Sequence, residues 1–126
     1  MSYIASMVME KGIDNMKLDM LDPASRKRML GDAAEFLIKE KRFDEAAKAL
    51  MMAEDFGKLK EIGLEYMGQK QYSIAAVFLV HTKEEPLLWE LSGFCLNNGF
   101  YNSAAEIFKS LGREDCRAFV EQNFLG

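Results

Sequence analysis

The sequence predicts an all-α fold of about three antiparallel helix hairpins, preceded by a helical segment and followed by a capping helix. Two features predict this fold: a 29-residue internal repeat, and apolar side chains that recur every three or four residues. The repeat is marked by the alanine pairs Ala46-Ala47, Ala75-Ala76 and Ala104-Ala105. No segment alternates apolar and polar residues over a convincing strand length.

Each copy of the repeat contains two helices joined by a short polar break. In the first helix, a leucine stands sixteen residues before the alanine pair, and a small residue follows that leucine four residues later. This spacing places both residues on one face of an amphipathic helix. We expect the small side chains to let the second helix approach closely. The leucines are Leu30, Leu59 and Leu88, and the small residues are Ala34, Gly63 and Ser92.

The second helix of each hairpin is predicted to begin near an aromatic residue. Phe43, Tyr72 and Tyr101 stand three residues before the alanine pairs. The residue after each aromatic has a side chain that accepts hydrogen bonds, so we expect it to be the N-cap. These expected caps are Asp44, Ser73 and Asn102.

The first 22 residues form a separate segment. Asp22 and Pro23 supply an N-cap and a proline for the first helical position of the first hairpin. Before them we expect a helix from Ser2 to Lys11, ended by Gly12, and a short second helix. The methionines of this segment suit adaptable contacts, so it is expected either to cover one end of the array or to join a second copy. They are Met7, Met9, Met16 and Met20.

The last helix is predicted over about Glu114 to Leu125. It carries apolar residues on one side, but the repeat register places Glu121 at the small-residue position, so we expect this helix to cap the array. The apolar residues are Cys116, Phe119, Val120 and Phe124. The predicted parts are residues 1–22, the hairpins at 23–112 (about 23–55, 56–84 and 85–112) and the cap at 113–126.

The second helices resemble the tetratricopeptide repeat in their aromatic, two intervening residues and alanine. The similar stretches are residues 41–47, 70–76 and 99–105, and the resemblance covers about 24–112. The period is 29 residues rather than the 34 of that family, so the chain is similar to a tetratricopeptide-like α-solenoid. The resemblance implies a right-handed α-α superhelix, whose concave face of first helices binds a segment of another protein.

Composition argues against several classes of function. The 126 residues carry a net charge of −4, with a pI near 5.1, which does not favour a nucleic-acid or anionic-membrane surface. No apolar run approaches the roughly 20 residues of a membrane span, and the first residues lack the pattern of a signal peptide. Cys95 and Cys116 are too few for a disulfide framework. We therefore expect a cytoplasmic protein.

The sequence offers little for catalysis or for metal binding. His81 is the single histidine, and the two cysteines fall at apolar positions, where a thiol is usually inert. No nucleophile elbow, phosphate-binding glycine loop or histidine-rich metal spacing is present. Paired carboxylates recur near the turns between hairpins, where the helix dipole favours them without a metal. We expect no enzyme, cofactor or metal. The pairs are Glu54-Asp55, Glu84-Glu85 and Glu114-Asp115.

The remaining prediction is a protein-interaction adaptor or scaffold. The resemblance implies that residues on the first helices contact the partner: Arg28, Glu35, Lys39, Lys60, Leu64, Trp89 and Asn97. Trp89 is either an exposed anchor or a packing residue of the fold. The cations would orient an acidic partner.

Two alternatives to the adaptor remain open. One is a nucleic-acid-associated protein that uses a basic first hairpin, for which phosphate contacts would need several cations on one side. The other is a structural subunit that self-assembles through its ends. The cations of the first hairpin are Arg26, Lys27, Arg28, Lys39, Lys41 and Arg42.

Overall fold

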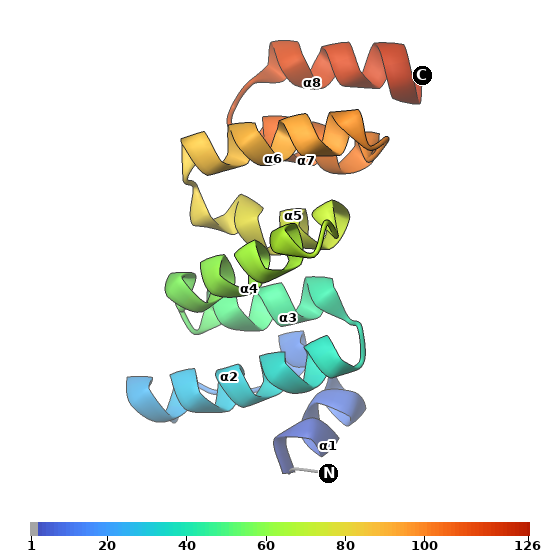
Figure 1. Ribbon diagram of the computed structural model, residues 1–126. Coiled ribbons are helices and arrows are strands. Elements are labelled where there is room, and N and C mark those ends of the chain that lie inside the picture. The colour runs from blue at the N-terminus through green and yellow to red at the C-terminus, as the bar shows by residue number, and fades with distance from the viewer. Residues whose placement is uncertain (1–2) are drawn as a thin grey trace. The chain divides into compact units, whose positions relative to one another are not determined.

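The computed structural model describes residues 3–126, with side chains from Met7 onward (Figure 1). These residues form helices and turns with no β-strand among them, which confirms the predicted all-α class. The chain divides into two compact units, Met1–Leu59 and Lys60–Gly126. The division falls inside α4 (Phe56–Gly68).

The first unit is built around one helix hairpin. It contains α1 (Tyr3–Lys11), the 3-10 helix η1 (Ile13–Asn15), α2 (Pro23–Lys39) and α3 (Phe43–Met52), and α2 packs on α3. The predicted N-cap of α2 is confirmed, because Asp22 Oδ1 accepts a 2.9 Å hydrogen bond from the Ser25 backbone N–H. This hydrogen bond lowers the pKa of Asp22 below its ordinary value.

The N-terminal segment packs against this hairpin. Helix α1 contacts α2, and η1 contacts α3. Asp14 of η1 also forms an ion pair with Lys48 of α3. The described part of the segment therefore covers its own hairpin, while Ser2, the expected helix start, lies outside the described residues. The buried apolar side chains of the segment are Val8, Ile13, Met16 and Leu18.

The second unit contains most of α4 and four further α-helices. The elements after α4 are α5 (Tyr72–Leu79), the 3-10 helix η2 (Val80–Thr82), α6 (Glu85–Asn97), α7 (Tyr101–Ser110), α8 (Glu114–Val120) and the π-helix η3 (Glu121–Leu125). In Figure 1, α4 and α6 lie on the near side of this unit, and α5 and α7 lie behind them.

Small residues allow close helix packing in the core of the second unit. Gly63 of α4 faces Leu79 of α5, which lies one turn after the alanine pair. Ser92 is buried, and its hydroxyl donates a 2.6 Å hydrogen bond to the Trp89 carbonyl oxygen. The hydroxyl is thereby satisfied inside an apolar core. The fully buried residues of this core include Ala75, Leu79, Leu88, Leu91, Cys95, Ala104, Ile107 and Val120.

The turns repeat with the same 29-residue period as the helices. After α4, the Gln71 N–H donates to the Tyr66 carbonyl and the Lys70 N–H donates to the Met67 carbonyl, which is the Schellman pattern. The same two hydrogen bonds close the turns at Lys41, Glu54, Gly99 and Gly112. Positive φ values recur with the same spacing, at Lys41, Lys70 and Gly99 after first helices and at Glu54, Lys83 and Gly112 after second helices; Gly12, after α1, also has a positive φ.

The expectation that Asp44, Ser73 and Asn102 cap the second helices is wrong. Helices α3, α5 and α7 begin at the aromatic residues, so these side chains lie within the first turn. Each true N-cap is also the last residue of the preceding Schellman turn, so backbone hydrogen bonds fix its position without a side-chain cap. The N-caps are Arg42, Gln71 and Phe100.

The C-terminal helix does not bury its whole apolar side as expected. Val120 is fully buried, but Phe119 is 58% exposed and Phe124 is 46% exposed. The last turn is a π-helix, and Phe124 stacks on Tyr101 of α7 with ring centroids 4.4 Å apart. Phe119 falls at the repeat position that Glu90 occupies in α6, which faces solvent. The predicted single apolar face is therefore divided.

Candidate partner-binding surface

The predicted partner-binding residues of the second unit lie on its first helices. Lys60 and Leu64 stand on α4, and Trp89 and Asn97 stand on α6. Leu64 and Trp89 are each 40% exposed, and Asn97 is exposed as well. The fold therefore leaves large apolar side chains of both helices in contact with solvent: Phe56 and Leu64 on α4, and Trp89 on α6.

Trp89 is partly packed within the fold and partly exposed, and its role as a partner anchor stays a prediction. Its ring lies against Phe108 of α7, with centroids 5.5 Å apart and planes inclined by 60°. The guanidinium carbon of Arg113 lies 5.2 Å from the indole centroid, within the range of a cation–π contact. These two neighbours hold the indole in place while leaving part of it open.

Arg113 is itself fixed by a carboxylate. Its Nε and Nη2 donate hydrogen bonds of 3.1 and 2.9 Å to the two carboxylate oxygens of Asp115. The hydrogen bonds from Arg113 lower the pKa of Asp115 to about 2, and the same contact raises the pKa of Arg113. The pair stays charged over the neutral range, so the cation over Trp89 is permanent.

Lys60 is engaged within the second unit. Its Nζ lies 3.0 Å from both carboxylate oxygens of Glu84, the N-cap residue of α6. Both side chains are roughly half exposed, so the ion pair adds little stability. The expectation that Lys60 orients an acidic partner depended on an unpaired ammonium, and in this structure that ammonium already has a carboxylate.

Sequence reasoning missed Arg113 and Glu84 as neighbours of the two predicted residues. Trp89 and Arg113 are 24 residues apart, and so are Lys60 and Glu84. Adding the 29-residue period to the second pair gives the first pair, so both are the same contact in successive repeats. The period would have revealed the second contact once the first was known. The period alone does not predict that either contact forms.

The predicted residues of the first unit lie on one face of α2. Arg28, Glu35 and Lys39 are exposed and are separated by seven and four residues, which keeps them on one side of a helix. None of the three makes an ion pair within the described part of the chain.

The basic first hairpin gives little support to the nucleic-acid alternative. Arg42 forms a two-pronged ion pair with Glu45, at 2.7 and 2.8 Å, and Arg26 donates to the Leu21 carbonyl oxygen. Exposed carboxylates also stand among the remaining cations of α2 and of the turn that follows it, which weakens any field that attracts phosphates. They are Asp32, Glu35 and Glu40.

Two residues considered for catalysis, Cys95 and His81, lie in the second unit in different environments. Cys95 is buried in the core of the second unit, where desolvation raises the pKa of its thiol to about 11. His81 lies in η2 beside a shallow cavity of about 290 Å³, which Lys83, Lys109 and Ser110 also line. The Cys95 thiol therefore stays neutral at neutral pH.

Comparison of the chain with family models, with curated proteins and with solved structures gives no match. Among the described residues, no group of three or more histidine, cysteine or carboxylate side chains is placed to hold a metal ion. Within the same residues, every helix is too short or too polar to cross a membrane.

Proposed function

We propose that this protein is a non-catalytic adaptor that receives a segment of another protein on its first helices, in the manner of tetratricopeptide-like helical arrays. The single observation that supports this function is the exposure of Leu64 and Trp89 on α4 and α6. Large apolar side chains left open on neighbouring helices are favoured as contact points in protein interfaces.

The packing around Trp89 supports an anchoring role. Phe108 and Arg113 hold the indole ring, so its side chain has little rotamer freedom left to lose on binding. A pre-ordered aromatic binds with a smaller entropy cost than a mobile one. We place this adaptor in the cytoplasm, where the free thiols of Cys95 and Cys116 would stay reduced.

Affinity capture with purified variants tests this function. Trp89→Ala and Leu64→Ser remove the two apolar contacts, and the Lys39→Glu/Lys60→Glu double variant reverses two predicted cations. We expect the apolar variants to lose at least one captured protein that the wild type retains. Gln69→Ala, at an exposed position in the turn after α4, is the matched control. If Trp89→Ala, Leu64→Ser and the double variant all retain every captured protein, the proposed surface is contradicted.

Self-assembly is a second candidate function because the C-terminal end of the second unit exposes aromatic rings. Phe119 packs edge-on against Phe124 with centroids 6.2 Å apart, and both remain about half exposed. If copies associate through this end, Phe119→Glu will convert an oligomer to a monomer in sedimentation velocity. A wild-type monomer at high micromolar concentration excludes self-assembly.

A further inference from the structure

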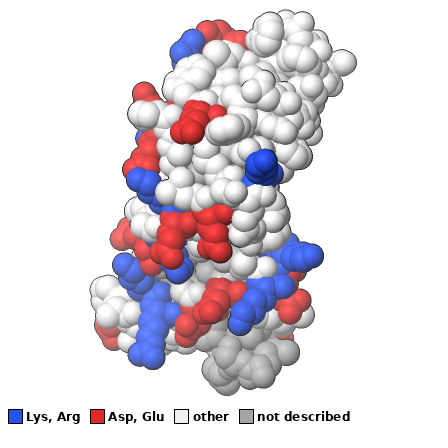
Figure 2. Space-filling model, viewed as in Figure 1, with Lys and Arg blue, Asp and Glu red and all other residues white. Residues whose placement is uncertain are grey.

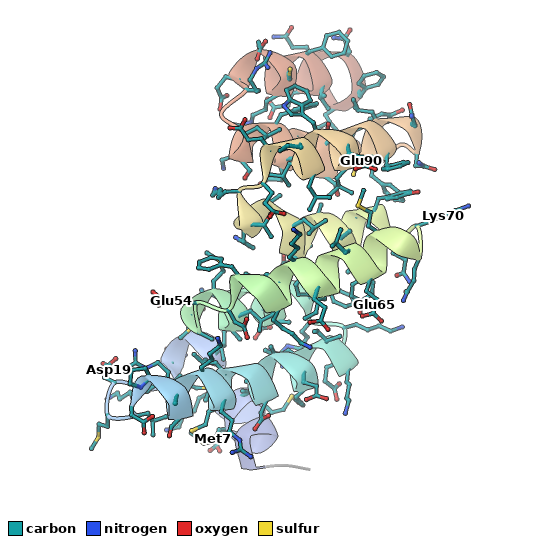
Figure 3. All side chains as sticks on the ribbon, turned by 60° about the vertical axis from the view of Figure 1, so that its left-hand side comes forward. Met7, Asp19, Glu54, Glu65, Lys70 and Glu90 are labelled. Carbon is teal, nitrogen blue, oxygen red and sulfur yellow. The ribbon has the colours of Figure 1, made fainter. Side chains whose placement is uncertain are left out.

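An unpaired glutamate directly follows each exposed apolar contact residue of the second unit. Glu65 follows Leu64 on α4, and Glu90 follows Trp89 on α6 (Figure 3). Both carboxylates are exposed, and neither forms an ion pair within the described part of the chain. The surface therefore presents two pairs, each of an apolar side chain and a free negative charge.

The helix dipole does not explain these two glutamates. Carboxylates favour the first turn of a helix, where Glu85 stands in α6, but Glu65 and Glu90 lie further along their helices. Glu65 also follows Glu61 at a spacing of four residues, an arrangement in which like charges destabilise a helix. Their positions leave both charges free for a contact outside the unit.

The charge around these residues is predominantly negative. Residues 60–126 contain nine acidic and six basic side chains. The part of α4 that belongs to the second unit has one lysine, Lys60, and Glu84 already neutralises its charge. Figure 2 shows acidic groups over α4 and α6, with basic groups beside those over α4 and mainly uncharged surface around those over α6.

We propose that the segment bound by the second unit is basic and apolar, with lysine or arginine side chains next to leucine-like ones. Its apolar side chains would contact Leu64 and Trp89, and its cations would pair with Glu65 and Glu90. This inference rests on the proposed adaptor function. It replaces, for the second unit, the acidic partner expected from Lys60, because opposite charges steer association and like charges oppose it.

Fluorescence of Trp89, the single tryptophan of the chain, tests the charge preference directly. The probes are a blocked peptide in which lysine, leucine and serine alternate, and a matched peptide with glutamate in place of lysine. We expect the lysine peptide to change the emission and to bind about tenfold more tightly or better at low salt, with affinity falling as salt is added. Tighter binding of the glutamate peptide, or no change with either peptide, overturns the proposal.

A matched pair of charge reversals separates a local contact from the effect of net charge. Glu90→Lys and Glu106→Lys change the net charge equally, but Glu106 is exposed on α7, a second helix. We expect Glu90→Lys to lower the affinity for the lysine peptide about fivefold or more. Glu106→Lys should lower that affinity by less than about twofold. Equal losses overturn the proposal. If neither peptide binds but Trp89→Ala still abolishes capture of a protein, the adaptor function stands and the proposal of a basic partner is overturned.

Discussion

Gly63 of α4 and Leu79 of α5 are so close that a Cβ atom on the glycine would lie 2.4 Å from the Leu79 Cγ. Leu79 is fully buried, and the overlap falls on its branch carbon rather than on the end of a flexible side chain. The glycine therefore sets how closely the two helices pack.

Replacing Gly63 by alanine should destabilise the protein although alanine is the better helix former. Overpacking a close contact costs about 1–3 kcal/mol, against about 1 kcal/mol gained in helix propensity. Gly93 of α6 is the matched control, because nothing lies within 4 Å of its added Cβ. We expect Gly93→Ala to stabilise the protein by about 0.5–1 kcal/mol. Urea denaturation followed by circular dichroism measures both changes, and equal signs for the two variants would contradict this packing.

The repeated left-handed turns predict opposite effects for two substitutions. Gly99 has a φ of 80° and Lys70, its equivalent in the preceding repeat, has a φ of 63°. The Lys70 side chain points into solvent, so replacing it loses little packing (Figure 3). The free energy at this position therefore depends mainly on the left-handed backbone conformation. We expect Gly99→Ala to lower the free energy of unfolding by about 1 kcal/mol and Lys70→Gly to raise it by up to that amount. A destabilised Lys70→Gly variant in thermal denaturation would show that the turn holds no such strain.

The contact between Arg113 and Trp89 predicts a change in tryptophan emission. In Arg113→Ala the indole loses the cation above its ring and gains water, so the emission should shift to longer wavelength and iodide should quench it more strongly. The emission shift of Arg113→Lys should lie between those of the wild type and Arg113→Ala, because an ammonium cannot stack as a planar guanidinium does. Arg117→Ala is the control, since Arg117 pairs with Glu121 and Glu114 instead. A similar shift in both alanine variants would argue against the specific contact.

The two cysteines should differ in reactivity. Cys95 is fully buried and Cys116 is half-buried, so Ellman's reagent at pH 8 should modify Cys116 first and Cys95 only when the protein opens. Cys116→Ser should leave a folded protein that reacts slowly, while denatured wild type should react at both thiols. Rapid modification of both thiols in the folded wild type would contradict the burial of Cys95.

Burial of Cys95 also predicts a loss of stability at high pH. Its pKa rises from an ordinary value near 9 to about 11 in the folded protein, so the unfolded chain ionises first as the pH increases. The stability gained by keeping the thiol neutral is complete below pH 9 and is lost between pH 9 and 11. Denaturation midpoints measured across this range should fall in the wild type and fall less in Cys95→Ala.

Much of the secondary structure could be predicted from the sequence, because it depends on spacing along the chain. The period placed the starts of α4, α6 and α8 29 residues apart, and the leucine and alanine columns are buried. The cap at Asp22 was also predictable, since both of its hydrogen bonds come from Ser25, which lies within one helical turn. The N-caps of the second helices were not, because turn geometry fixes them through the carbonyls of the preceding helix.

The sequence by itself determined which residues form helices, which faces of those helices are apolar, and where they repeat. Local hydrogen bonds and helical periodicity depend only on nearby residues, so these features can be read along one segment. Only the tertiary structure decided that Lys60 is paired with Glu84, that Arg113 covers Trp89, and that Phe119 stays exposed. Each of these outcomes depends on side chains that packing brings together from different helices, or on the side of a helix that packing leaves uncovered.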